Sequence, residues 1–137
     1  MSTELLVETR FYIEGIVVHG EGRGRKIGFP TANIDFSASC LETGVYGVRI
    51  KINHTNYYGV MNIGVKPTFH KVYEKSIEVY IIDFNQLIYG AFVQVEVVFK
   101  IRDEQKFNNI QELQSQIKKD IEYATSLLLP DLMNKEK

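Results

Sequence analysis

Between about Glu14 and Arg102 the chain alternates apolar and polar side chains, which is the period of a strand with one buried face. Short runs of this kind occupy residues 16–18, 45–53, 57–63, 76–84 and 91–101. The turn-forming stretch Asn53-His54-Thr55-Asn56 predicts a hairpin between two of these runs. Because no helical pattern interrupts the runs, they predict an antiparallel barrel or sandwich and not a parallel α/β sheet.

The last run is the most regular of the set. Its alternation places four side chains on one face: Val93, Val95, Val97 and Phe99. Gln94, Glu96 and Lys100 fall on the opposite face.

After this run the hydrophobic period changes to that of a helix. Asn109, followed three residues later by Glu112, resembles a capping box at a helix start. Pro130 predicts that the helix ends at about Leu129. The apolar positions with helical spacing are Ile110, Leu113, Ile117, Ile121, Ala124 and Leu128. The pattern predicts one amphipathic helix that closes one face of the barrel.

Length and composition are those of one globular domain. The 137 residues are 45% hydrophobic and 24% charged, and they carry 16 Lys and Arg against 17 Asp and Glu. This balance argues against an extended basic surface that binds nucleic acid. We expect residues 1–13 to be a leader or linker, residues 14–130 to form the domain, and residues 131–137 to be a tail.

The single cysteine, Cys40, excludes an internal disulfide and a Cys-rich zinc site. No run approaches the ~20 apolar residues of a membrane helix, and the first ten residues lack the apolar core of a signal peptide. These features predict a cytoplasmic protein without membrane contact.

A glycine-rich segment is the first candidate for chemistry. Gly20, Gly22, Gly24 and Gly28 allow backbone N–H groups to face one centre, and Arg23, Arg25 and Lys26 add positive charge beside them. A phosphate group fits this composition. The spacing matches neither a Walker A loop nor a Rossmann fingerprint. Glycine content alone is also consistent with a mobile loop between strands.

The residues that follow the glycines favour a nucleotide site. Pro30 presets an extended or turn conformation, and in an extended chain Thr31 and Asn33 project to the same side. Their hydroxyl and amide oxygens are neutral hard ligands, and Mg²⁺ takes few protein ligands when phosphate and water complete its shell. The segment therefore predicts a Mg²⁺-nucleotide clamp. The alternative is that both side chains bond only to nearby backbone.

The segment Gly24-Arg25-Lys26-Ile27-Gly28-Phe29-Pro30-Thr31-Ala32-Asn33 closely resembles the signature of riboflavin kinases. The resemblance covers about residues 14–128 and is strongest to the kinase module of bacterial bifunctional riboflavin kinase/FAD synthetases. Leu41-Glu42-Thr43 departs from it, because many bacterial members carry a proline there. Further matches occur in order at Gly44–Val48, Met61–Phe69, Glu78, Asp83-Phe84, Tyr89-Gly90, Arg102 with Phe107, and Asp120.

The resemblance implies a six-stranded antiparallel Greek-key β-barrel with a C-terminal α-helix. It implies the reaction of MgATP with riboflavin to give FMN and ADP, with Glu78 as catalytic base and Thr31 and Asn33 as ligands of Mg²⁺. The implied ATP-binding residues are Gly20, Gly22, Arg23, Gly24, Arg25, Lys26, Gly28, Pro30, Thr31 and Asn33. The implied flavin-binding residues are Asn62, Gly64, Pro67, Thr68, Phe69, Arg102 and Phe107.

Two alternatives to the enzyme remain open. A barrel of the same fold could hold flavin or FMN without turnover, but Thr31, Asn33 and Glu78 are all present, which favours the enzyme. A barrel that binds single-stranded nucleic acid is disfavoured by the near-neutral charge, so no nucleic-acid partner is expected. The sequence lacks the His-x-Gly-His motif of the adenylyltransferase found in bifunctional relatives, and that domain is possible only in a longer parent chain. By pattern alone, Glu78 is an ordinary solvated strand residue.

Overall fold

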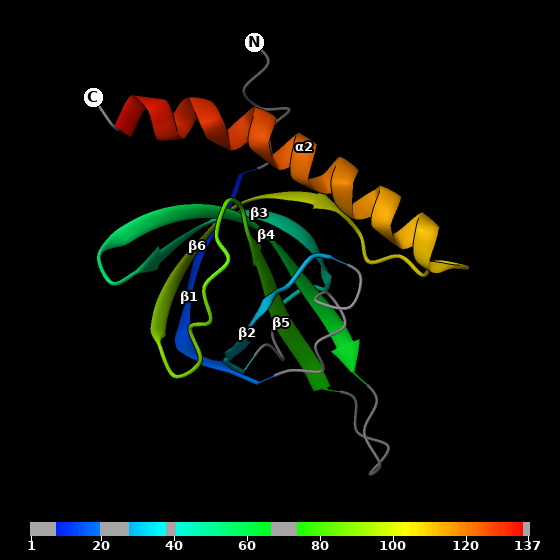
Figure 1. Cartoon of the computed structure of the whole chain (residues 1–137), viewed down its shortest axis with the longest axis horizontal. Coiled ribbons are helices and arrows are strands. Elements are labelled where there is room, and N and C mark those ends of the chain that lie inside the picture. The colour runs from blue at the N-terminus through cyan, green and yellow to red at the C-terminus, as the bar shows by residue number, and fades with distance from the viewer. Residues whose placement is uncertain (1–7, 20–27, 38–40, 67–73, 136–137) are drawn as a thin grey trace.

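A computed structural model of the protein describes residues 8–19, 28–37, 41–66 and 74–135. Six strands close into a barrel in the order β1-β2-β5-β4-β3-β6, and every neighbouring pair is antiparallel. One helix follows the strands and lies across the barrel (Figure 1). The elements are β1 (Glu8–Val18), β2 (Ala32–Asp35), β3 (Gly44–Ile52), β4 (Thr55–Lys66), β5 (Glu74–Ile81), β6 (Phe92–Arg102) and α2 (Ile110–Lys135). The predicted barrel with a C-terminal helix is confirmed.

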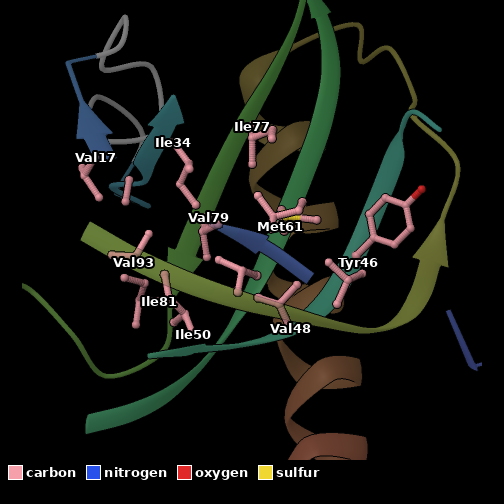
Figure 2. Packing of buried hydrophobic residues seen from close by; sticks show 14 of the residues in the cluster. Val17, Ile34, Tyr46, Val48, Ile50, Met61, Ile77, Val79, Ile81 and Val93 are labelled. Atoms are coloured by element: carbon pink, nitrogen blue, oxygen red, sulfur yellow. The ribbon is translucent and has the colours of Figure 1, made fainter. Parts of the chain in front are cut away.

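The barrel interior is filled by β-branched and other aliphatic side chains from all six strands. Figure 2 shows Val17, Ile34, Val79 and Val93 pointing toward one another inside the barrel. These side chains come from alternate strand positions, which is why the sequence alternates. Burying an aliphatic side chain of this size contributes roughly 1.5–3 kcal/mol, so the interior is the main source of stability.

The predicted hairpin between β3 and β4 is confirmed. Asn53 and His54 form its two-residue turn, with φ angles of 50° and 69°. Left-handed values at both central positions match the right-handed twist of the flanking strands, and asparagine tolerates them well. The hairpin register then runs from Ile52 opposite Thr55 to Gly44 opposite Ile63.

The prediction that Phe99 lies on the same face of the strand as Val97 is wrong. Gly47 lies opposite Phe99 and Val48 lies opposite Val97, so β6 carries one extra residue here and forms a β-bulge. The bulge turns Phe99 to the helix side of the sheet, where its ring meets Tyr123 edge-on at 6.1 Å. Gly47 makes room for it, because a Cβ at that position would lie 2.4 Å from the Phe99 ring.

Helix α2 packs mainly on the outer face of β4, with β6 beside it. Ala124 and Leu128 are buried there against Val45, Tyr58 and Val60. The predicted helix start is also confirmed. The Asn109 side-chain oxygen accepts a hydrogen bond of 2.8 Å from the Glu112 N–H, and the Glu112 carboxylate accepts one of 3.1 Å from the Asn108 N–H.

Both predicted boundaries of the domain differ from the structure. Helix α2 continues through Pro130 to Lys135, so Pro130 does not end it at Leu129. A proline removes one N–H donor from a helix without preventing the next turn from forming. At the other end, β1 begins at Glu8, within the expected leader, because Phe11 and Ile13 pair with Val97 and Val95 of β6. In the part of the chain that the structure describes, no helix is long and apolar enough to span a bilayer.

Candidate functional site

Three polar residues lie side by side on the outer face of the barrel. Asn33 of β2 is opposite Glu78 of β5, and Glu78 is opposite Asn62 of β4. The chain neighbours of Glu78, Ile77 and Val79, are buried in the core, so Glu78 points outward. Directly opposite side chains in an antiparallel pair have Cβ atoms roughly 4.5–5.5 Å apart. The sheet thus forms a row in the order Asn33, Glu78, Asn62.

Thr31 joins this row from the segment before β2. Its hydroxyl donates a hydrogen bond of 2.9 Å to the Glu78 carboxylate, across 47 positions of sequence. Thr31, Asn33 and Glu78 are each half-buried. The two predicted metal ligands and the predicted base therefore meet in one place, and Glu78 is not a fully solvated strand residue.

The oxygens of this cluster fit a hard divalent cation. The Thr31 oxygen donates its proton to Glu78 and keeps its lone pairs available, and Asn33 offers an amide oxygen from the neighbouring strand position. Mg²⁺ prefers a small number of such oxygen ligands and completes its octahedron with phosphate and water oxygens. Thr31 and Asn33 would hold the ion as part of a metal–nucleotide complex.

Aromatic contacts anchor the described residues on both sides of the glycine-rich segment. His19 stacks on Tyr89 with ring centroids 3.8 Å apart, and Phe29 meets Tyr80 edge-on at 5.8 Å. Tyr80 is on β5, two residues from Glu78, so Phe29 lies beside the strand that carries the carboxylate. Most of the predicted phosphate-binding residues lie outside the described residues: Gly20, Gly22, Arg23, Gly24, Arg25 and Lys26.

Gly28 is the one glycine of the predicted phosphate-binding segment that lies among the described residues. Its φ is +93°, and a Cβ there would have no heavy atom within 4 Å. We expect Gly28→Ala to strain the backbone by about 1–2 kcal/mol without a steric clash, and to raise the KM for ATP more than that for riboflavin. Gly28→Asn tolerates a left-handed φ and should recover most of the loss. Steady-state kinetics of both variants tests this, and equal kinetics for Ala and Gly would contradict it.

A recess of about 230 Å³ opens below Thr31 at one end of the barrel. Pro30 and Thr31, which the sequence analysis assigned to ATP, form part of its wall. The rest of its lining is mainly apolar and includes Val17, Val79, Phe84, Ile88 and Tyr89. Asp83-Phe84 and Tyr89-Gly90 match the riboflavin kinase pattern, but the sequence predicts no role for them. Phe84 and Tyr89 reach the recess because the loop after β5 folds next to Thr31, and the sequence pattern does not report this.

Residues predicted to bind the flavin extend the row of Asn33, Glu78 and Asn62 on the side away from β2. Gly64 lies two residues beyond Asn62 on β4, and the Glu104 carboxylate occupies the space above it, 2.5 Å from where a Gly64 Cβ would be. Arg102 lies opposite Val45, which in turn lies opposite Asn62. The predicted residues Pro67, Thr68 and Phe69 lie outside the described residues.

Arg102 is held by the helix. Its guanidinium donates to both oxygens of Asp120, with the shortest bond at 2.8 Å, and Asp120 is only 3% exposed. Gln116 donates a further bond of 3.0 Å to Asp120. The Arg102 guanidinium lies 5.8 Å from the ring centre of Phe107. Arg102 and Phe107, both predicted for the flavin, are therefore neighbours whose positions depend on α2.

The segment between β6 and α2 has further anchors. Arg102 donates a hydrogen bond of 3.1 Å to the Asp103 carbonyl. Lys100 forms an ion pair with the Asp103 carboxylate at 2.6 Å and a second one with Glu42. Hydrogen bonds to Asp103 and Glu42 raise the pKa of Lys100, so it stays protonated. A shallow cavity of about 450 Å³ lies between this segment and the first turns of α2, and Phe107 and Gln116 contribute to its wall.

We expect Asp120→Ala to destabilise the fold by about 3 kcal/mol, because it leaves the Arg102 charge without its partner at a mostly buried position. Urea unfolding should show a lower midpoint with an unchanged slope. The control is Glu122→Ala on an exposed position of the same helix, which should leave the midpoint in place. An unchanged midpoint for Asp120→Ala would show that the ion pair does not fasten α2 to β6.

A closed six-stranded barrel with one C-terminal helix is the fold that the resemblance to riboflavin kinases implies. A family model described as Flavokinase: Riboflavin kinase matches residues 7–128. The chain belongs to the riboflavin kinase family.

Individual proteins agree with this assignment. The RNA-binding riboflavin kinase RibR of Bacillus subtilis (strain 168) is 50% identical over 109 residues, which cover 80% of this chain and 47% of that protein. The bifunctional riboflavin kinase/FMN adenylyltransferase of the same organism is 48% identical over 124 residues, covering 88% of this chain and 39% of that protein. The crystal structure of riboflavin kinase from Trypanosoma brucei superposes with a TM-score of 0.65 at 25% identity, covering 93% of this chain and 85% of that one.

The chain spans less than half the length of the two Bacillus relatives. One of them is named as RNA-binding, so the relatives give no support to the expectation that this chain has no nucleic-acid partner. That expectation stays a prediction. The adenylyltransferase named in the second relative keeps open the predicted longer parent chain.

Proposed function

We propose that this protein is an ATP:riboflavin 5′-phosphotransferase, which moves the γ-phosphate of ATP to the primary hydroxyl of the ribityl chain and yields FMN and ADP. The observation that carries the proposal is the convergence of Thr31, Asn33 and Glu78 in one half-buried cluster. Phosphoryl transfer needs positioning and charge neutralisation more than covalent help, and this cluster offers both beside a proton acceptor.

The order of the row supports a division of the two substrates between its two sides. The nucleotide lies on the β2 side of Glu78, with its base at the apolar recess below Thr31 and its phosphates under the glycine-rich segment. Riboflavin lies on the β4 side, toward Asn62, Arg102 and Phe107. Glu78 then stands between the two substrates, where the attacking hydroxyl must be.

In the reaction, the oxygen of the ribityl hydroxyl attacks the γ-phosphorus, and Glu78 accepts the proton of that hydroxyl. The Thr31 hydroxyl holds the Glu78 carboxylate in place by its hydrogen bond of 2.9 Å. Thr31 and Asn33 would also hold Mg²⁺, which neutralises phosphate charge when it is bound with ATP. The bond between the β,γ-bridging oxygen and the γ-phosphorus breaks, and ADP leaves on the β2 side.

The direct test is to incubate the protein with riboflavin, ATP and Mg²⁺ and to separate the flavins by chromatography. We expect FMN and ADP to form in equal amounts. Binding of riboflavin without FMN, at every Mg²⁺ concentration tried, would instead identify a flavin-binding module of the same fold. A cytoplasmic location, expected from the sequence, is part of the same proposal because ATP and riboflavin would both have to reach the site.

A further inference from the structure

Among the residues that the structure describes, the buried side-chain oxygen of Asn62 has no hydrogen-bond partner. Buried polar atoms in folded proteins nearly always have a partner, so an unpaired one requires an explanation. Leaving an acceptor unpaired disfavours the ligand-free fold, because the oxygen has lost its water without gaining a donor. An atom of this kind next to a candidate active site is a place where a ligand can supply the missing donor.

The orientation of the amide explains which of its two atoms is left unpaired. The position that a Cβ on Gly64 would take is 2.5 Å from a Glu104 carboxylate oxygen and 3.5 Å from the Asn62 amide nitrogen. The nitrogen therefore lies on the side of the negative charge. Rotating the amide by half a turn would bring its oxygen toward the carboxylate, which is electrostatically unfavourable. The oxygen consequently faces away from Glu104.

The sheet register places this oxygen beside the candidate base. Asn62 lies directly opposite Glu78, on the side away from Asn33 and Thr31. Its Cβ is therefore roughly 4.5–5.5 Å from that of Glu78. Asn62 as a whole is only half-buried, so its amide lies near the outer surface of the barrel.

We propose that the Asn62 side-chain oxygen accepts a hydrogen bond from the 4′-hydroxyl of the ribityl chain, the hydroxyl next to the one that is phosphorylated. This rests on the proposed kinase function and assigns Asn62 a specific task within it. With the attacking 5′-hydroxyl at Glu78, the chain continues toward β4 and presents its next hydroxyl at Asn62. Asn62 thereby makes the site select a polyol and not a simple alkyl alcohol.

The test compares riboflavin with 4′-deoxyriboflavin on the wild-type protein and on Asn62→Ala. Dissociation constants come from flavin fluorescence, and kcat/KM comes from phosphorylated product. In the wild type we expect loss of the 4′-hydroxyl to weaken binding and to lower kcat/KM by about 10-fold, the value of one hydrogen bond to a buried acceptor. In Asn62→Ala the two flavins should differ by about 2-fold or less, because the acceptor is gone.

Ser76→Ala is the matched control. Ser76 lies two residues before Glu78 on the same face of β5, opposite Gly64, and its variant should keep the wild-type discrimination between the two flavins. A wild-type protein that does not discriminate, or an Asn62→Ala protein that discriminates as the wild type does, overturns the inference. Because the binding arm needs no turnover, absence of FMN would refute the kinase proposal without deciding the role of Asn62.

Asn62→Leu gives a second readout that is independent of catalysis. Leucine has nearly the shape of asparagine and removes the unpaired acceptor, so the ligand-free variant should have a Tm equal to or above that of the wild type while losing discrimination against 4′-deoxyriboflavin. A clearly lower Tm with discrimination intact would show that Asn62 serves the fold and not the substrate.

Discussion

Replacing Glu78 by glutamine is expected to lower kcat by about 10²–10⁴-fold, the range associated with removing a general base. Glutamine keeps the size of the side chain and can still accept the hydrogen bond from Thr31, which is 2.9 Å long in the structure. It cannot accept the proton of the ribityl hydroxyl. A loose, metaphosphate-like transition state depends less on a base, which places the loss toward the low end of the range.

The pattern of kinetic constants distinguishes a base from a binding residue. KM values for riboflavin and for ATP should change little, because neither ground-state complex depends on proton transfer. Glu14→Gln, on an exposed outward position of β1, is the control for loss of one strand carboxylate and should retain full activity. Glu78→Gln with wild-type kcat would reduce Glu78 to a structural partner of Thr31. Loss of riboflavin binding would point to a ligand-positioning role.

Replacing Thr31 by valine is expected to lower kcat/KM for MgATP by about 10²–10³-fold, comparable to removing one preorganised group that stabilises developing charge. Valine preserves the shape of threonine but removes the oxygen that bonds Glu78 and that would hold Mg²⁺. Asn33→Ala should have a similar effect, because Asn33 lies opposite the same carboxylate. Activity as a function of Mg²⁺ concentration measures both, and the concentration for half-maximal rate should rise.

Thr31→Ser is the matched control, because serine keeps the hydroxyl and removes only a methyl group. It should retain most of the activity and an unchanged Mg²⁺ dependence. Riboflavin affinity should stay near the wild-type value in Thr31→Val and Asn33→Ala, since both residues lie on the β2 side of Glu78. Full activity of both variants at ordinary Mg²⁺ concentrations would remove these residues from the site.

Local features of the chain were sufficient for five of the six strands, for the helix start and for the class of fold. The alternation in residues 45–53 and 91–101 follows from burying one face of each strand, and the Asn53-His54 turn follows from the tolerance of asparagine for left-handed φ. The Asn109–Glu112 cap likewise depends on residues three positions apart. These interactions are decided within a few residues, so the sequence pattern reports them directly.

The candidate chemistry was predictable in a more limited way. Thr31 and Asn33 could be assigned to one side of an extended chain from their spacing alone, but Glu78 had no distinguishing pattern and depended on the resemblance to riboflavin kinases. Residues of the recess in the loop after β5, such as Phe84 and Ile88, carried no signal of a site. An apolar side chain lines a core and a binding recess equally well, and only its surroundings separate the two.

The sequence by itself determined five of the six strands, the hairpin, the helix start and the family, but its pattern did not predict β2. The tertiary structure decided which residues meet. Closure of the barrel sets β2 against β5, so Thr31 reaches Glu78 across 47 residues and Asn33 and Asn62 stand on either side of it. Register also decided the bulge that turns Phe99 toward α2. Strand pairing joins segments far apart in the chain, and its register depends on the packing of all six strands together, which no local pattern contains.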